Sequence, residues 1–435
     1  MWRKSVTPLL TGTFILRLCG GANTVVYGLF LAKLAPYTGN AITSLQIGLL
    51  SVVYYATELT FAPLMGAMSD RWGRRRFLIV GPLLGLLQQS LILFTPLQQP
   101  LPFLLGLQMI AGISSAMQVP AVLGYLADYT ARTPSRRLRV MSLYELVTSG
   151  GIAAGVICGG LAWDRLGRYA FTLFASFYLL AAVCMLFAPK VSQIIEHGNV
   201  RALLVRYWRI VRTPRLFIFI PAWICVNALV GVWFGPQLTF ILAKAGYNSQ
   251  QHLMGSLSGP GGGHRLSLVL GAFVLFFGLC LLFWAFFLGH VPRLRLMLIS
   301  LVGVYIACIA LAGINHRGDG NNVLLFLWVP LLMLGVFAES GFAPAALAYL
   351  ADISEMASKD RGLLMGLYSI FLGAGQLLGN GLGGMFAHRW GFDGLILLTV
   401  LLASVALGSL LLLYRQDKSA FYRQGPTTTR YSARL

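Results

Sequence analysis

Charged residues are scarce in this chain. Only 11% of its 435 residues are Asp, Glu, Lys or Arg, whereas 57% are hydrophobic and the mean hydropathy is +0.75. Soluble domains carry roughly 25% charged residues, and a soluble protein of this length would need far more polar surface. The composition therefore excludes a soluble globular protein and predicts a membrane protein that crosses the bilayer many times.

Acidic residues are fewest, with 13 against 33 basic residues and a net charge of +20. In a soluble protein this excess would suggest nucleic-acid binding, but in a membrane protein basic residues accumulate in cytoplasmic loops. We therefore expect no nucleic-acid partner. The six cysteines all lie in apolar runs, at spacings that fit no metal site. With no paired catalytic constellation either, we expect no metal, no cofactor and no enzyme activity.

Twelve apolar runs have the length of a membrane span, which takes about 20 helical residues. Their approximate limits are 8–34, 42–66, 76–97, 101–127, 140–163, 168–189, 215–243, 267–290, 294–313, 323–350, 362–387 and 393–414. Gly231 and Gly235-Pro236 predict a kink in the seventh run. The sequence thus predicts an all-α polytopic membrane protein with twelve transmembrane helices.

The basic residues also predict which side of the membrane each loop faces. Twenty-five of the 33 fall on the side that holds both termini, seven fall on the other side, and Arg17 lies inside the first run. Since cytoplasmic loops carry the excess of Lys and Arg, both termini are expected in the cytoplasm. The longest loop on that side, residues 190–215, mixes apolar residues with arginines, which favours a short helix at the membrane surface.

This loop separates two halves that repeat each other. We expect a six-helix domain over residues 1–190, a linker over 191–214, and a second six-helix domain with a cytoplasmic tail over 215–435. With a shift of 224 residues, Pro120–Gly167 aligns without a gap to Pro344–Gly391, and 17 of the 48 positions are identical. PAVLGYLAD at 120–128 thereby meets PAALAYLAD at 344–352. Parallel repeats of this kind are a known transporter plan, with the substrate site between the halves near mid-membrane.

The loop GAMSDRWGRRR, residues 66–76, lies between the second and third apolar runs. It resembles the loop between helices 2 and 3 of the major facilitator superfamily, whose pattern is roughly G-x-x-x-D-R-x-G-R-R/K. The matching residues are Gly66, Asp70, Arg71, Gly73, Arg74 and Arg75. The corresponding loop of the second half keeps Gly289, Arg293 and Arg295 but has no acid at the position of Asp70.

The resemblance implies that this loop is a gate. Asp70 is expected to accept hydrogen bonds at the N-terminal end of the eleventh helix, where free N–H groups favour an anion. The arginines would pair with Asp128 at the end of the fourth helix, clamping the halves on the cytoplasmic side. The repeat extends the gate set to Arg137 and to the second-half counterparts Asp352 and Arg361. The alternative is that these arginines only fix the topology.

The fifth run contains GGIAAGVICGG, residues 150–160. It resembles the helix-five pattern of drug antiporters, G-x-x-x-G-P-x-x-G-G, at Gly151, Gly155, Gly159 and Gly160, with Val156 in place of the proline. Glycines at this spacing let helices approach closely. In the fourth run Gln108 stands where the family often has a buried arginine, and both departures weaken the resemblance to exporters.

Four charged side chains lie well inside the predicted spans: Arg17, Glu58, Glu145 and Glu339. Each costs roughly 2.5–3.5 kcal/mol at mid-span on insertion scales, so each needs a partner or a function. Arg17 and Glu58 lie at similar depths and could pair, while Glu145 could compete for Arg17. The pair would be either structural or switched by substrate or a proton during transport.

Glu339 lies close to mid-membrane with no arginine at a similar depth in its half, which makes it the first candidate for proton coupling or for binding a cationic substrate. The alternative is a protonated carboxyl bonded to a neighbouring helix. The other cavity candidates are polar or aromatic residues on the first, fourth and seventh runs: Asn23, Tyr27, Gln108, Ser115, Gln118, Trp223, Asn227, Trp233 and Gln237. Such a cavity suits lipophilic or weakly cationic molecules better than phosphorylated ones.

The sequence therefore predicts a secondary active transporter of small molecules, working by rocker-switch alternating access. We expect proton-coupled export of lipophilic or drug-like compounds by a monomer in the plasma (inner) membrane of a prokaryote, in contact with membrane lipids. One alternative is an uptake permease or facilitator for a small metabolite. An alternative of another class is a transport-dead membrane receptor or scaffold, against which the intact gate loop argues.

Overall fold

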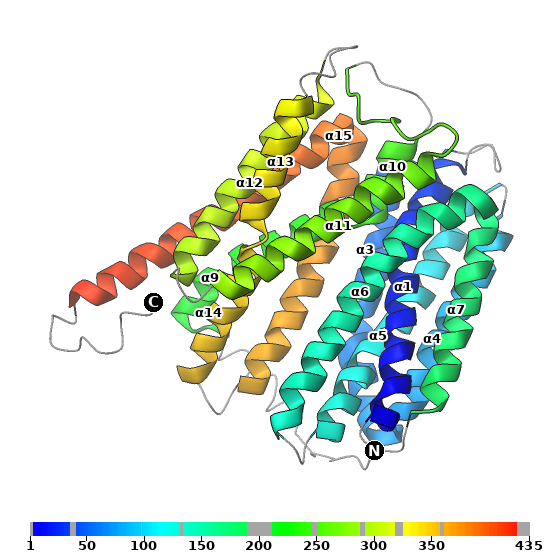
Figure 1. The fold of residues 1–435 in the computed structure, drawn as a ribbon, viewed down its shortest axis with the longest axis horizontal. Helices are drawn as coiled ribbons and strands as arrows, with labels where there is room; N and C mark the ends of the chain where they lie inside the picture. The colour runs from blue at the N-terminus through cyan, green and yellow to red at the C-terminus, as the bar shows by residue number, and fades with distance from the viewer. Residues whose placement is uncertain are drawn as a thin grey trace. The chain divides into compact units, whose positions relative to one another are not determined.

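The computed structural model of this chain describes residues 3–34, 41–96, 98–130, 134–188, 211–244, 250–287, 292–317, 325–356 and 361–423. Within these ranges every regular element is a helix (Figure 1). A helix satisfies its own backbone hydrogen bonds, which is what a segment crossing hydrocarbon requires. The all-α class predicted from the sequence is confirmed.

The helices of the first half begin and end close to the predicted limits. They are α1 (Arg3–Ala32), α3 (Ser44–Trp72), α4 (Arg74–Leu91), α5 (Pro100–Thr130), α6 (Pro134–Leu166) and α7 (Ala170–Leu186), with short 3-10 turns at Ile92–Phe94 and Gly167–Tyr169. The predicted surface helix in the 190–215 loop lies outside the described residues up to residue 210.

The second half contains two broken spans. Its helices are α9 (Pro214–Trp233), α10 (Pro236–Ala243), α11 (Gly262–Phe287), α12 (Arg293–Asn315), α13 (Leu325–Glu339), α14 (Phe342–Met356) and α15 (Arg361–Arg423). The kink predicted at Gly235-Pro236 is the break between α9 and α10, where Gly235 has extended backbone and Pro236 begins the next helix. The break between α13 and α14, at Ser340 and Gly341, was not predicted.

Ten stretches in the described ranges are long and apolar enough to cross a membrane. Two of them, Leu143–Leu186 and Ile370–Gln416, are 44 and 47 residues long, so each has the length for two crossings. Each is interrupted by a glycine with a positive φ, Gly167 at +55° and Gly391 at +62°. These lengths agree with twelve spans, while the side on which the termini lie stays a prediction.

The chain forms two compact units. The first comprises Met1–His197 together with Phe234–Tyr247 and Met254–Phe273, and the second comprises Gly198–Trp233, Asn248–Leu253 and Val274–Leu435. The covalent order therefore differs from the spatial grouping, because α10 and the first part of α11 pack with the first half of the chain. The domain limits predicted from the sequence remain predictions.

Each unit contains the same close helix pair. In the first unit a Cβ atom at Gly151 would lie 2.7 Å from the Phe14 carbonyl oxygen of α1. In the second unit a Cβ at Gly375, the position 224 residues later, would lie 2.7 Å from the Ile224 carbonyl oxygen of α9. The sequence repeat is therefore also a repeat of packing, since the matched glycines admit the matched helices.

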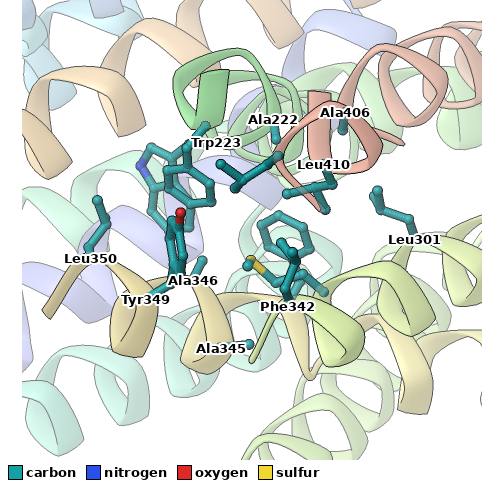
Figure 2. Close-up of a cluster of buried hydrophobic side chains, with 14 of the residues drawn as sticks. Ala222, Trp223, Leu301, Phe342, Ala345, Ala346, Tyr349, Leu350, Ala406 and Leu410 are labelled. Atoms are coloured by element: carbon teal, nitrogen blue, oxygen red, sulfur yellow. The ribbon is translucent and has the colours of Figure 1, made fainter. Parts of the chain in front are cut away.

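The core of the second unit is aromatic (Figure 2). Trp223 of α9 is 3% exposed and stacks on Phe219, with ring centroids 6.1 Å apart, and on Phe342 of α14, 6.4 Å away. Ala345 and Ala346 of α14 are fully buried beside these rings. Small residues on α14 therefore make room for the large rings of α9.

Candidate functional site

The predicted gate loop forms the junction between α3 and α4. Gly73 joins the two helices with a φ of +99°, a backbone conformation that residues with a Cβ rarely adopt. Asp70 near the end of α3 makes an ion pair with Arg74 at the start of α4, with Nη2 and Oδ1 2.8 Å apart. The Arg74 side chain is 14% exposed, whereas that of Asp70 is 52% exposed. Asp70 is thus the solvent-facing member of the pair.

The arginines of this loop reach other helices of the first unit. The Arg74 guanidinium lies directly against Gly124 of α5, and a Cβ at that glycine would displace it. Arg75 donates a hydrogen bond to the Leu186 carbonyl oxygen at the end of α7. The loop therefore connects the junction of α3 and α4 to α5 and to the end of α7. The side chains of Asp128 and Arg137 lie outside the described residues, so their place in the gate stays a prediction, as does the expected bond from Asp70 to the eleventh helix.

The second unit contains an ion pair that corresponds to the pairing expected between the gate-loop arginines and Asp128 in the first half. Arg293 at the start of α12 pairs with Asp352 of α14, and its Nη1 also donates to the Ala348 carbonyl oxygen at 2.9 Å. Both side chains are about one-third exposed. The side chain of Arg361 lies outside the described residues. Asp352 is the repeat counterpart of Asp128, so this pair is the form that the first-half pairing is expected to take.

The intramembrane charges of the first unit lie near each other but do not form a direct ion pair. Glu58 of α3 accepts a hydrogen bond from the Ser115 hydroxyl of α5 at 2.6 Å, and the Tyr54 hydroxyl also bonds to it. Arg17 of α1 lies within electrostatic range of Glu58. Its Nη2, however, donates to the Tyr144 hydroxyl of α6 at 3.4 Å. Hydroxyl groups thus satisfy both charged groups.

Glu145, the other carboxylate considered for Arg17, has an exposed side chain on α6. The neighbouring Tyr144 turns inward and is 5% exposed. Sequence reasoning missed Tyr54 and Tyr144 because it counted only charges and their depth. Tyrosines one turn from an intramembrane Glu, or directly beside one, are the signal that could have found them.

Glu339 is the last residue of α13, at the break before α14. Among the described residues no hydrogen bond or ion pair reaches its carboxylate, and Cys308 of α12 lies within electrostatic range. The next residue, Ser340, is 1% exposed and donates its hydroxyl to the Phe337 carbonyl oxygen at 2.8 Å. Discontinuous helices of this kind form the substrate and ion sites of many secondary transporters.

The cavity candidates of the first unit form two polar contacts between helices. Asn23 of α1 accepts a hydrogen bond from Gln89 of α4 at 3.0 Å. One turn later on α1, the Tyr27 hydroxyl lies against the Gln108 side chain of α5. Sequence reasoning missed Gln89, which is 1% exposed. Together these side chains form a polar layer inside the first unit.

Two further candidates of this unit behave differently. Gln118 donates to the Ser114 hydroxyl one turn earlier on α5, at 2.8 Å, and its Cγ lies against Gly81 of α4, so it packs at the contact between α5 and α4. Gln237 of α10 is 1% exposed, and neither atom of its amide has a hydrogen-bond partner among the described residues. A buried amide without partners costs free energy, so Gln237 is available to bond a bound molecule or water.

The candidates of the second unit lie at helix contacts. Trp223 belongs to the aromatic core described above (Figure 2). Asn227 donates to the Trp223 carbonyl oxygen at 2.8 Å, one turn earlier on α9. Trp233 donates its indole N–H to the Thr399 hydroxyl of α15 at 3.0 Å. The Asn227 amide N–H and the Trp233 indole N–H are thus used within the unit.

The glycine row of the fifth span lies on α6, where the helix meets α1. Cβ atoms at Gly155 and Gly159 would meet backbone atoms of Leu18 and Ala22. Gly160, the last of the row, faces α11 instead, at Gly263 and Ser267. The row therefore serves two different helix contacts.

Comparison with known proteins gives the family. A model of the Major Facilitator Superfamily matches residues 9–263 and 250–430. Multidrug resistance protein 1 of Bacillus subtilis (strain 168) is 28% identical over 179 residues, which are 41% of this chain and 43% of that protein. The class C tetracycline resistance protein of Escherichia coli is 34% identical over 115 residues, 26% of this chain and 27% of that protein. Each alignment thus spans less than half of the relative.

The lysophospholipid transporter LplT of Escherichia coli (strain SE11) is 24% identical over 242 residues, 56% of this chain and 53% of that protein. Among solved structures, that of the nucleoside transporter NupG matches with a TM-score of 0.72 and 14% identity, over 95% of this chain and 98% of that one. A likeness at this identity is one of fold. The family model, by contrast, covers nearly all of the present sequence. This multi-pass membrane protein therefore belongs to the Major Facilitator Superfamily.

Proposed function

We propose that this transporter exports lipophilic or drug-like compounds in exchange for protons, by rocker-switch alternating access, as a monomer in the plasma membrane of a prokaryote. Its coupling residue is Glu339, and Arg17 and Glu58 form a second charged site in the first unit. The observation that carries the proposal is the Glu339 carboxylate, which no described side chain bonds at the break between α13 and α14.

The position of Glu339 suits it to carry a proton. A charge inside a membrane span costs roughly 2.5–3.5 kcal/mol on insertion scales, and intramembrane carboxyl groups mark proton relays and ion pathways. A carboxyl group without a paired cation avoids this free-energy cost when it binds a proton, because it is then neutral. The cost returns when the proton is released. The helix break supports the same role, because it ends α13 at the carboxyl group.

The names of the relatives support export of lipophilic compounds. Two of the proteins described above are named for multidrug and tetracycline resistance. The candidate cavity residues agree with this class, because most are amides, hydroxyls and aromatic rings. Gln237, with both amide atoms free of partners among the described residues, is the candidate for bonding an uncharged polar group of the substrate.

Replacing Glu339 with Gln tests the coupling. In proteoliposomes with tetracycline and tetraphenylphosphonium as probes, Glu339→Gln should abolish transport driven by a pH gradient at zero membrane potential. Exchange of labelled for unlabelled probe needs no net proton movement and should persist. Asp393→Asn is the control, because Asp393 lies beside the Gly391 turn and bonds His316 and Asn315 rather than a coupling residue. Undiminished gradient-driven flux in Glu339→Gln would rule out this coupling role.

Transport of an amphiphile with a lipid tail is the second candidate. The alignment with the lysophospholipid transporter spans 56% of this chain, more than those with the two resistance proteins. A lysophospholipid that competes with tetraphenylphosphonium in the same proteoliposomes would favour this substrate class. Net uptake into cells, rather than extrusion, would favour the permease alternative over export.

A further inference from the structure

The end of α6 holds the beginning of α11 by its carboxylate. Asp164, near the C-terminal end of α6, accepts hydrogen bonds from two backbone N–H groups in the first turn of α11. Gly263 donates to Oδ1 at 3.1 Å, and His264 donates to Oδ2 at 2.6 Å. The first N–H groups of a helix have no partner within the helix, and its N-terminal end favours an anion. Asp164 therefore caps a helix to which it does not belong.

A second contact one turn away joins the same two helices. The Ser267 hydroxyl of α11 accepts from the Gly160 N–H at 3.0 Å and donates to the Val156 carbonyl oxygen at 3.1 Å. It thus bridges two groups that lie one turn apart in the backbone of α6. A Cβ at Gly263 would lie 2.7 Å from the Gly160 carbonyl oxygen, and a Cβ at Gly160 would collide with the Gly263 carbonyl. The helices touch through their backbones here, which only glycine allows.

The residues of this contact repeat the pattern of the gate loop. Gly160-x-x-x-Asp164-Arg165-x-Gly167 has the same residues at the same spacing as Gly66-x-x-x-Asp70-Arg71-x-Gly73. In both copies the last glycine has a positive φ, +55° at Gly167 and +99° at Gly73. Between the two copies the chain runs through α4, α5 and α6. Three crossings reverse the side, so the second copy lies at the membrane face opposite to the 66–76 loop.

The grouping of the chain indicates why this contact would have to open. Gly262–Phe273 of α11 belongs to the first unit, whereas the rest of that helix belongs to the second. The segment before α11 is bonded to α10, where the Leu257 N–H donates to the Leu242 carbonyl oxygen at 2.8 Å. The beginning of α11 and α10 are therefore tied together, and both attach to helices of the first half.

We propose that Asp164, Gly160 and Ser267 form an outer latch, which holds the beginning of α11 on α6 and must release for the transporter to open at that face. It is the counterpart, at the opposite face, of the gate loop at 66–76. In this latch the carboxylate caps the first turn of α11, the serine joins the two backbones, and the paired glycines bring them into contact. Release exposes the two N–H groups and the carboxylate to water, which limits the cost of opening.

The latch is tested by the exposure of α10. Thr239 of α10 is 1% exposed, and it lies against Gly28 of α1. A cysteine introduced at Thr239 should react with a membrane-impermeant maleimide added at the outer face only when the latch is open. The labelling rate is measured in intact cells. For each variant, the rate of the same variant with Thr239 unchanged is subtracted, so that only the reaction of the introduced cysteine is counted.

Asp164→Ala removes the cap and should raise the labelling rate about three- to tenfold, in line with the usual effect of losing a helix cap. Asp164→Asn keeps an acceptor oxygen and should give a smaller increase. Gly160→Ala should raise labelling as well, whereas Gly278→Ala, also on α11 and with no atom within 4 Å of the added Cβ, should not.

An unchanged labelling rate in Asp164→Ala would overturn the latch, even if the melting temperature of that variant fell. Asp164 is exposed, so Asp164→Ala is expected to fold. If Gly160→Ala fails to insert into the membrane, the labelling rate of Asp164→Ala alone tests the latch. The inference rests on alternating access but not on substrate or coupling ion. Since labelling uses neither, failure of the latch leaves the role of Glu339 untouched, and failure of proton coupling leaves the latch untouched.

Discussion

Replacing Gly155 with Ala tests the close contact between α6 and α1. The added Cβ would collide with the Leu18 carbonyl group and lie 2.7 Å from the Ala22 backbone nitrogen. Both neighbours are backbone, so no side-chain rotation relieves the overlap and the helices must move apart. Overpacking of this kind costs about 1–3 kcal/mol, and removing a helical glycine returns about 0.5–1 kcal/mol. The net loss of unfolding free energy is about 1–2 kcal/mol.

The assay is the melting temperature of the purified protein in detergent. The unfolding entropy is about 2.1 cal/mol/K per residue, so in a chain of 435 residues we expect Gly155→Ala to lower the melting temperature by about 1–2 °C. Gly106→Ala on α5 is the matched control, because nothing lies within 4 Å of its added Cβ. It should leave the melting temperature unchanged or slightly raised. Equal melting temperatures for the two variants would refute the argument that backbone contact at Gly155 sets the helix spacing.

Three further outcomes follow from contacts in the second unit. Gly379→Ala, at the repeat counterpart of Gly155, should lower the melting temperature by a similar amount; no effect would contradict the packing repeat. Thr399→Val should cost about 1 kcal/mol, because it leaves the Trp233 indole without its acceptor, and unchanged thermal stability would contradict this. Arg293→Asp and Asp352→Arg should each slow transport, and the double variant should recover most of it if the pair acts as a gate; no recovery would contradict the pairing.

The two helix breaks show which interruptions of a span can be predicted from the sequence. The kink between α9 and α10 was predicted because Gly235-Pro236 stands inside an apolar run. The break at Ser340 was missed, although Pro344 follows four residues later and cannot donate to the Ser340 carbonyl group. A proline four residues after an intramembrane polar residue was therefore the overlooked signal, and it places Glu339 at a helix end.

The candidate site was harder to predict because side-chain direction matters as much as depth. Residue counting placed Arg17 and Glu58 at similar depths, and they do lie within electrostatic range. Counting along one helix does not give the facing residue of another, so the hydroxyl partners Ser115 and Tyr144 could not be assigned. Trp223 shows the converse problem, since an aromatic residue on a cavity-lining helix can equally fill the core.

The central claim is tested most directly by measuring proton movement that accompanies substrate movement. Proteoliposomes holding the unmodified protein and a trapped pH-sensitive dye are given an outward gradient of tetracycline at zero membrane potential. Exchange for protons predicts that the lumen acidifies as the probe leaves, and that Glu339→Gln removes this acidification. Probe efflux at the same rate with no change of lumenal pH would contradict proton-coupled export.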